Sequence, residues 1–263
     1  MKLMKRITKF ILNLTSVGSI VLIATLNPFQ FAVMKGAIPP VDDAPGGTEP
    51  GGPRFIQPIE DIEAPPTGRV RSVRGGCASS NPVSLTALVP KNKIGRTVSD
   101  YPTFFFYLPK TDAELAELIL EDESGTKIYQ QDLTIKNLSG VIGVSIPANT
   151  NVPPLEVGKS YTWKFTVVCD PEDRSSDQLE TGIVRRVELS PDILGQLDAA
   201  DPRQKTVIYA QNGIWQDALG TLAAARRANP NDTDLAVDWE ILLDSVTLRE
   251  IAKEPIVEME AQP

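Results

Sequence analysis

The stretch that decides the fold is "YTWKFTVVCD", residues 161–170, in which large apolar side chains alternate with smaller or polar ones. Successive side chains of a β-strand point to opposite faces, so the alternation predicts a strand with one buried face. That face carries Tyr161, Trp163, Phe165, Val167 and Cys169. A face this aromatic is typical of a core strand, so we expect its cysteine in the core rather than at an exposed reactive site.

The residues before this strand form a recognisable corner. In "LEVGKSYTW", Leu155, Gly158, Tyr161 and Trp163 follow the order Leu-x-x-Gly-x-x-Tyr-x-Trp. This order resembles the corner that leads into a core strand of immunoglobulin-like and fibronectin type III domains. The resemblance implies a tyrosine corner, in which the hydroxyl of Tyr161 bonds back to the backbone of the preceding loop. It implies a fold and says nothing about function.

The pattern over residues 69–190 predicts a seven-stranded, immunoglobulin-like antiparallel sandwich, because short alternating runs are separated by turn-forming segments. The predicted strands are Leu85–Val89, Thr103–Leu108, Leu115–Glu121, Thr126–Leu133, Gly140–Ile146, Ser160–Cys169 and Thr181–Leu189. The run at 115–121 also fits a helix capped by Thr111 or Asp112. Arg185 and Arg186 lie within the last run, and such charges suit an edge strand.

After Ser190 the pattern becomes helical, so we expect helices over residues 191–250, packed on the sandwich, and a disordered tail over 251–263. "SPDILGQL" and "DPRQKTVIYA" each begin with a cap residue followed by proline. The hairpin "YAQNGIWQDALGTLAAARRANP", residues 209–230, resembles a tetratricopeptide repeat in its aromatic, glycine, alanine and proline spacing. It is either a plain helical pair on the sandwich or a docking surface that includes Trp215.

The N-terminus predicts export. Residues 1–34 begin with the basic "MKLMKRITK", followed by the apolar "FILNLTSVGSIVLIATL", which is typical of a secretory signal or an uncleaved anchor. We therefore expect a periplasmic or secreted protein, or one anchored facing outward. Residues 35–68 are rich in proline and glycine, which predicts a disordered linker. The alternative for this segment is a proline-rich ligand for another domain.

In an exported chain the two cysteines, Cys77 and Cys169, predict a structural disulfide. The alternative, a redox pair or thiol nucleophile, lacks both a Cys-x-x-Cys spacing and a histidine. Arg69, Arg71 and Arg74 precede the first cysteine. They form either a contact for an anion or anionic polymer, or a solvated lead-in strand.

Composition argues against catalysis and against nucleic acid as a partner. The chain has no histidine, the commonest general base and metal ligand, so we expect no catalytic residue, metal site or cofactor. The first 34 residues carry four of the 26 cations and no acid, so the remainder has 22 cations against 34 acids, a net charge of −12. Such an acidic body does not suit phosphate backbones. The acids at 121–123 and 170–177 form turns or, alternatively, a paired-carboxylate or calcium site.

Six blocks in order are similar to the cyanobacterial family called domain of unknown function 928. They are "RGGC", "LTALVP", "YPTFFFYLP", "YTWKFTVVCD", "GIVRRV" and "NGIWQDALGTLAAARRANP", and the likeness covers about residues 70–245. The resemblance implies a cyanobacterial, extracytoplasmic protein and no catalytic residue.

The patterns together favour a non-enzymatic interaction or structural module of the cell envelope. Its partner would be another envelope protein, and it would meet the membrane only through an uncleaved N-terminus. The alternative is a module that binds an envelope polysaccharide, or an enzyme that cleaves such a polymer with Asp and Glu.

Overall fold

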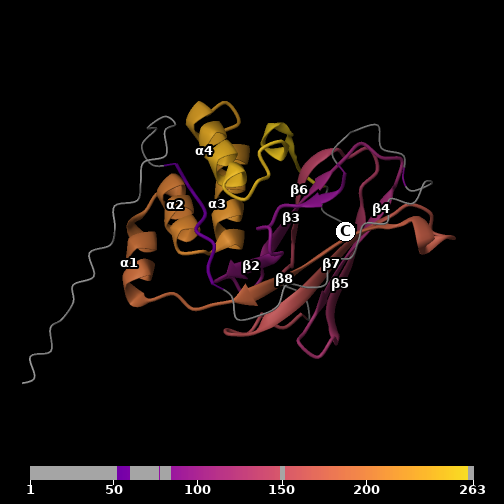
Figure 1. The fold of residues 1–263 in the computed structure, drawn as a ribbon, viewed down its shortest axis with the longest axis horizontal. Helices are drawn as coiled ribbons and strands as arrows, with labels where there is room; N and C mark the ends of the chain where they lie inside the picture. Colours follow the sequence, from indigo (N-terminus) through magenta and orange to yellow (C-terminus); the bar gives the residue numbers. More distant parts are fainter. Residues whose placement is uncertain (1–51, 60–76, 78–83, 149–151, 260–263) are drawn as a thin grey trace, which may run out of the picture. The chain divides into compact units, whose positions relative to one another are not determined.

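A computed structural model of the chain describes residues 52–59, 77, 84–148 and 152–259 (Figure 1). Within these residues nine strands form two sheets, and four α-helices follow the first eight strands. The strands are β1 (Thr86–Ala87), β2 (Ile94–Thr97), β3 (Thr103–Leu108), β4 (Leu115–Glu121), β5 (Lys127–Thr134), β6 (Gly140–Ser145), β7 (Ser160–Val168), β8 (Gln178–Arg186) and β9 (Ile256–Val257). The helices are α1 (Pro191–Ala199), α2 (Pro202–Gln211), α3 (Trp215–Ala228) and α4 (Thr233–Asp244), with short 3-10 helices η1 (Arg174–Ser176) and η2 (Ile251–Lys253).

Strand β7, the stretch from which the fold was predicted, lies at the centre of the five-stranded sheet, whose order is β2-β8-β7-β4-β5. Trp163 of β7 is opposite Leu120 of β4 on one side and Gly182 of β8 on the other. A Cβ on Gly182 would lie 2.2 Å from the Trp163 ring, so the glycine makes room for the indole. Residues 115–121 form strand β4 with a buried face of Ala116, Leu118 and Leu120, so their helical alternative is wrong.

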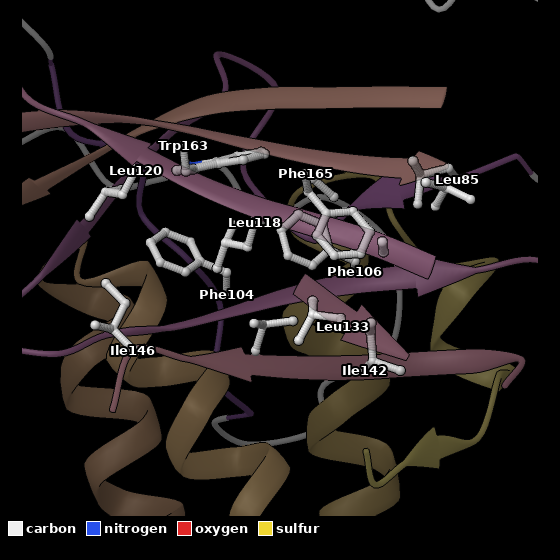
Figure 2. Close-up of a cluster of buried hydrophobic side chains, with 14 of the residues drawn as sticks. Leu85, Phe104, Phe106, Leu118, Leu120, Leu133, Ile142, Ile146, Trp163 and Phe165 are labelled. Carbon is white, nitrogen blue, oxygen red and sulfur yellow. The ribbon is translucent and has the colours of Figure 1, made fainter. Parts of the chain in front are cut away.

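The second sheet has the order β1-β3-β6-β9, and the space between the two sheets is filled by apolar side chains. Figure 2 shows Trp163 and Phe165 of β7 facing Phe104 and Phe106 of β3. The rings of Phe106 and Phe165 stack with centroids 3.9 Å apart, and Trp163 meets Phe106 edge-on at 5.6 Å. The β-sandwich expected from the alternating runs is therefore present.

The four-stranded sheet is buried on both faces, because the helices cover the face that is turned away from the sandwich core. Phe105 and Tyr107 of β3 belong to a second apolar cluster with Trp215 and Leu219 of α3 and Trp239 of α4. This double burial explains why "TFFFYL" lacks polar alternation, as is usual for strands covered on both sides. The described domain is thus built of three layers: sheet, sheet and helices.

Both sheets are mixed, so the purely antiparallel, seven-stranded prediction is wrong. Strand β2 pairs parallel with β8, and β9 pairs parallel with β6. Residues 94–97 lay outside the predicted strands, and their sequence "IGRT" contains one large apolar residue and a glycine. Their strand conformation comes from β8, through bonds such as the one from the Ile183 N–H to the Lys93 carbonyl, 2.8 Å.

Two further expectations fail for the same non-local reason. Strand β8 lies between β2 and β7 and is not an edge strand, and Arg186 donates to the Leu155 carbonyl and pairs with Asp100. The tail expected to be disordered contains η2 and β9 within its described part, residues 251–259. Strand β9 is only two residues long and is held by β6, so its own sequence carries little strand signal.

Candidate interaction surface

Helices α1, α2 and α4 line an open hollow of about 650 Å³, which we call the helical groove. Its lining includes the apolar residues Ala199, Val207 and Ile208 and the charged residues Asp201, Arg203 and Asp238. An apolar lining with a few placed charges is the usual composition of a binding surface.

The start of α2 positions the charged side of the groove. Asp201 caps the helix by accepting from the Gln204 N–H at 2.9 Å, and the Gln204 side chain accepts from the Asp201 N–H at 3.1 Å. Pro202 occupies the first helical position, where its missing N–H costs nothing. This capping box places Arg203 in the first turn, facing α4.

Arg203 ties α2 to α4. Its Nε donates to Asp238 Oδ2 at 2.6 Å and its Nη1 donates to Asp234 Oδ2 at 3.1 Å. The Asp238 side chain is only 6% exposed, and its hydrogen bond raises the pKa of Arg203. The cation of the groove is therefore held by carboxylates of this chain.

The groove is set in an acidic surface. Helices α1, α2 and α4 with the cap residues Asp201 and Asp232 carry eight acids, of which Asp238 is buried, and two cations, a net charge of −6. Charge complementarity steers and orients partners, so this surface favours a basic segment.

Residues 52–59, "GPRFIQPI", which we call the strap, run as an extended segment beside α2 (indigo in Figure 1). The Ile56 N–H donates to the Ala210 carbonyl at 3.0 Å, and the Phe55 N–H donates to Ser245 Oγ at 3.1 Å. Phe55 meets the ring of Trp215 edge-on, with centroids 5.0 Å apart. The disordered linker predicted for residues 35–68 is therefore wrong for 52–59.

Both ends of the strap depend on close approaches by glycine. Gly213 has a φ of 72°, and a Cβ there would lie 2.3 Å from the ring of Pro58. A Cβ on Gly52 would lie 2.4 Å from the side chain of Ile241 on α4. Phe55 is the single aromatic residue of the predicted linker, and it was the available signal that part of the segment docks.

Trp215, the predicted surface residue that the structure describes, does not line the groove. Trp215 is fully buried, and its Nε1 donates to the Leu88 carbonyl at 2.7 Å, so its assignment to an exposed docking surface is wrong. The apolar stripe of α3 faces the four-stranded sheet, which places Trp215 beneath the strap. Arg69, Arg71 and Arg74 lie outside the described residues.

The predicted disulfide between Cys77 and Cys169 is present, with the two Cα atoms 4.9 Å apart. It joins the lead-in to the end of β7. The Tyr161 hydroxyl accepts from the Glu156 N–H at 2.9 Å, which ties it to the preceding loop. Both features stabilise the sandwich and offer no reactive group.

The two acidic runs form turns and ion pairs. Asp122 accepts from the Ser124 hydroxyl and the Thr126 N–H, and these bonds lower the pKa of Asp122. Asp173 has its pKa lowered in the same way by Ser175. A general acid needs a raised pKa, so these carboxylates do not suit acid catalysis. Across residues 52–59, 77, 84–148 and 152–259, no cluster of three or more acids and cysteines is placed to hold a metal ion.

One half-buried, hydrogen-bonded carboxyl was missed by the sequence pattern. Asp217 of α3 accepts from the Thr97 hydroxyl at 2.8 Å and from the Val98 N–H at 3.1 Å, and burial raises the pKa of Asp217. It lines a cavity of about 120 Å³ together with Gln216, which is 3% exposed. A space of this size holds about four water molecules. The hydrogen bond between Asp217 and Thr97 joins α3 to β2, and we call this pair the clasp.

The fold and surface together define a class: a disulfide-closed β-sandwich whose second sheet is covered by a helical layer with an acidic groove. Residues 68–256 match the family model Domain of Unknown Function (DUF928), and the chain belongs to this family. No curated protein matches the chain significantly.

Among solved structures, the chain is similar to the fn3 domain of the human collagen alpha-1(XX) chain, with 17% identity and a TM-score of 0.27. The match covers 44% of this chain and 91% of that chain. The immunoglobulin-like topology and the tetratricopeptide-like hairpin stay predictions. In the described part of the chain, no helix is both long and apolar enough to cross a bilayer.

Proposed function

We propose that this chain is a non-enzymatic, extracytoplasmic interaction module of the cyanobacterial cell envelope. It binds an extended, basic segment of another envelope protein along the helical groove. The observation that carries the proposal is the strap, because the helical layer that forms the groove already holds an extended peptide of this same chain.

The strap uses the interactions by which helical surfaces recognise peptides. Two backbone N–H groups of the strap find acceptors on the helical layer, and one aromatic ring packs on a buried tryptophan. The groove is lined by an earlier part of the same helix α2, which includes Val207 and Ile208, and by Asp238 of α4. Its volume of about 650 Å³ accommodates several side chains, and its net negative surroundings suit lysine or arginine.

Two features support a location outside the cytoplasm. The basic and apolar start of the chain is typical of an export signal. The bond between Cys77 and Cys169 is of the kind that persists in an oxidising compartment.

A polysaccharide partner has less support. Sugar rings stack on exposed aromatic faces, whereas all three tryptophans of the chain are fully buried. We therefore keep a protein segment as the proposed ligand.

Site-specific photo-cross-linking tests the proposal. A photoreactive amino acid at Val207, in the groove, is compared with the same residue at Val157, an exposed valine before β7. Crosslinking in intact envelopes should give a discrete adduct from position 207 alone. A synthetic lysine-rich, proline-containing peptide should compete for that adduct, whereas its glutamate counterpart should not. Equal adducts at both positions, or equal competition by the two peptides, would count against the groove.

A further inference from the structure

A second hollow, of about 400 Å³, lies at the far end of α3, away from the groove residues. It is lined by Arg226 and Arg227 of the last turn of α3, by Pro230, and by Ile256 and Glu258 at β9. Two arginines therefore line one concave space of a chain whose body is strongly acidic.

Neither arginine has an acidic partner among the described residues. By contrast, Arg174, Arg186 and Arg203 each pair with a carboxylate. The Arg226 guanidinium lies 5.3 Å from the ring centroid of Trp239 on α4, and its Nη1 is buried without a hydrogen-bond acceptor in the described chain.

The indole Nε1 of Trp239 is likewise buried and without an acceptor from the described residues. Arg226 and Trp239 thus each have one buried N–H donor without an acceptor in the described chain. Burial without a neighbouring carboxylate lowers the pKa of Arg226, which reflects an uncompensated cation. A partly buried charge is costly until an opposite charge approaches it, and a guanidinium matches the oxygens of a carboxylate or phosphate.

We propose that this hollow binds an oxyanion group, a carboxylate or a phosphate, carried on a small solute. Arg226, whose guanidinium lies over the ring of Trp239, provides the planar donor set, and the exposed Arg227 adds a second positive charge. The net charge of −12 on the body beyond residue 34 repels a long polyanion but leaves a local site for a single anionic group.

Glu258 gives the proposal an internal check. It is exposed, lines the same hollow and forms no ion pair with either arginine in the described structure. Its carboxylate repels an incoming anion, so removing its charge should strengthen binding. A purely structural role for the two arginines predicts no such gain.

The test is a titration of the isotopically labelled full chain, at constant ionic strength, with inorganic phosphate in one arm and acetate in the other. The readout is the indole N–H signal of Trp239 in the NMR spectrum. The signals of Trp163 and Trp215 serve as internal controls, because Trp239 is the tryptophan whose ring lies beneath Arg226. A saturable shift confined to Trp239 is expected, and the tighter-binding arm identifies the phosphate or the carboxylate as the group recognised.

Variants separate recognition from folding. Arg226→Gln should weaken binding about tenfold or more, and Arg226→Lys should weaken it less because the charge is kept. Glu258→Gln should tighten binding about two- to fivefold. The matched control is Arg249→Gln, which removes an exposed arginine paired with Glu240 and should change nothing.

Three results would overturn the proposal. They are the absence of a saturable shift with either anion, unchanged affinity in Arg226→Gln, and an effect of Arg249→Gln as large as that of Arg226→Gln. Glu258→Gln keeps the test decisive if the Arg226 variants fail to fold, because the glutamate is exposed and its replacement leaves the core intact. An unchanged affinity in this variant would also refute the site.

Discussion

Replacing Phe55 with alanine should release the strap from the helical layer while the sandwich stays folded. The ring is half-buried against Trp215, and complete burial of a phenylalanine contributes about 1.5–3 kcal/mol, so its share is about 1 kcal/mol. The edge-to-face contact adds about 1 kcal/mol. A loss of about 2 kcal/mol raises the local opening constant about 30-fold.

Trypsin cleavage after Arg54 measures this opening, because Arg54 lies in the strap directly before the substituted residue. A protease cuts a docked segment only after local opening, so the cleavage rate follows the opening constant when reclosing is fast. Mass spectrometry identifies the product of this single cut, and the rate in Phe55→Ala should be about 30 times that of the natural protein.

Two controls isolate the docking effect. Ile59→Ala alters a strap residue that is 97% exposed, so its cleavage rate should equal that of the natural protein. Short peptides with Phe55 or alanine after Arg54 give the intrinsic preference of trypsin, which is divided out. A corrected increase below about threefold, or an equal increase in Ile59→Ala, would refute the docked strap and remove the main support for the groove.

Three other predictions concern stability and use chemical denaturation. Gly182→Ala should lower the free energy of unfolding by about 3 kcal/mol because its Cβ would meet a buried indole at 2.2 Å, whereas Gly195→Ala, in open space on a helix, should raise it by about 0.5–1 kcal/mol. Equal effects of the two substitutions would contradict the packing. Joint replacement of Cys77 and Cys169 by serine should cost about 4–5 kcal/mol, since the bond spans a separation of 92 residues, and an unchanged denaturation midpoint would disprove this. Burial raises the pKa of Asp217, so its contribution to stability falls as the pH rises above about 4, and Asp217→Asn should gain stability relative to the natural protein between pH 4 and 7. A constant difference over that range would exclude the buried carboxyl as the cause.

Local patterns predicted the long strands well. The runs at 103–108 and 115–121 match β3 and β4, and "YTWKFTVV" lies in β7. These strands each carry enough alternating or fully apolar side chains to define a buried face without reference to the rest of the chain. Period-two alternation is a property of neighbouring residues, so it can be read before the fold is known.

Short strands and the order of strands could not be predicted in the same way. Residues 94–97 and 256–257 become strands because β8 and β6 offer them a parallel edge. Which strands pair, when they are this far apart in the sequence, depends on how the whole sheets pack. The prediction that Arg185 and Arg186 mark an edge strand was wrong for this reason. Charged residues near the end of an interior strand resemble the charged residues of an edge strand.

Local sequence patterns predicted the binding surfaces of the protein even less well than the short strands. The clasp joins Thr97 to Asp217 across 120 positions, and the groove needs three helices to converge. Neither Asp217 nor Asp238 differs in its sequence context from an ordinary solvated helix residue. Burial, which makes them distinctive, arises only when other elements cover them.

The sequence by itself determined the long strands of the sandwich, the helices that follow them and the pairing of the two cysteines. Periodicity and capping are local properties, and two cysteines allow a single pairing. Only the tertiary structure decided that Trp215 faces inward, that residues 52–59 dock on the helices, and that Arg226 stays without a carboxylate partner in the described chain. Those outcomes depend on which surfaces meet, and surfaces are formed by residues far apart in the chain. Binding sites are made of such surfaces, so the scaffold could be predicted before the sites.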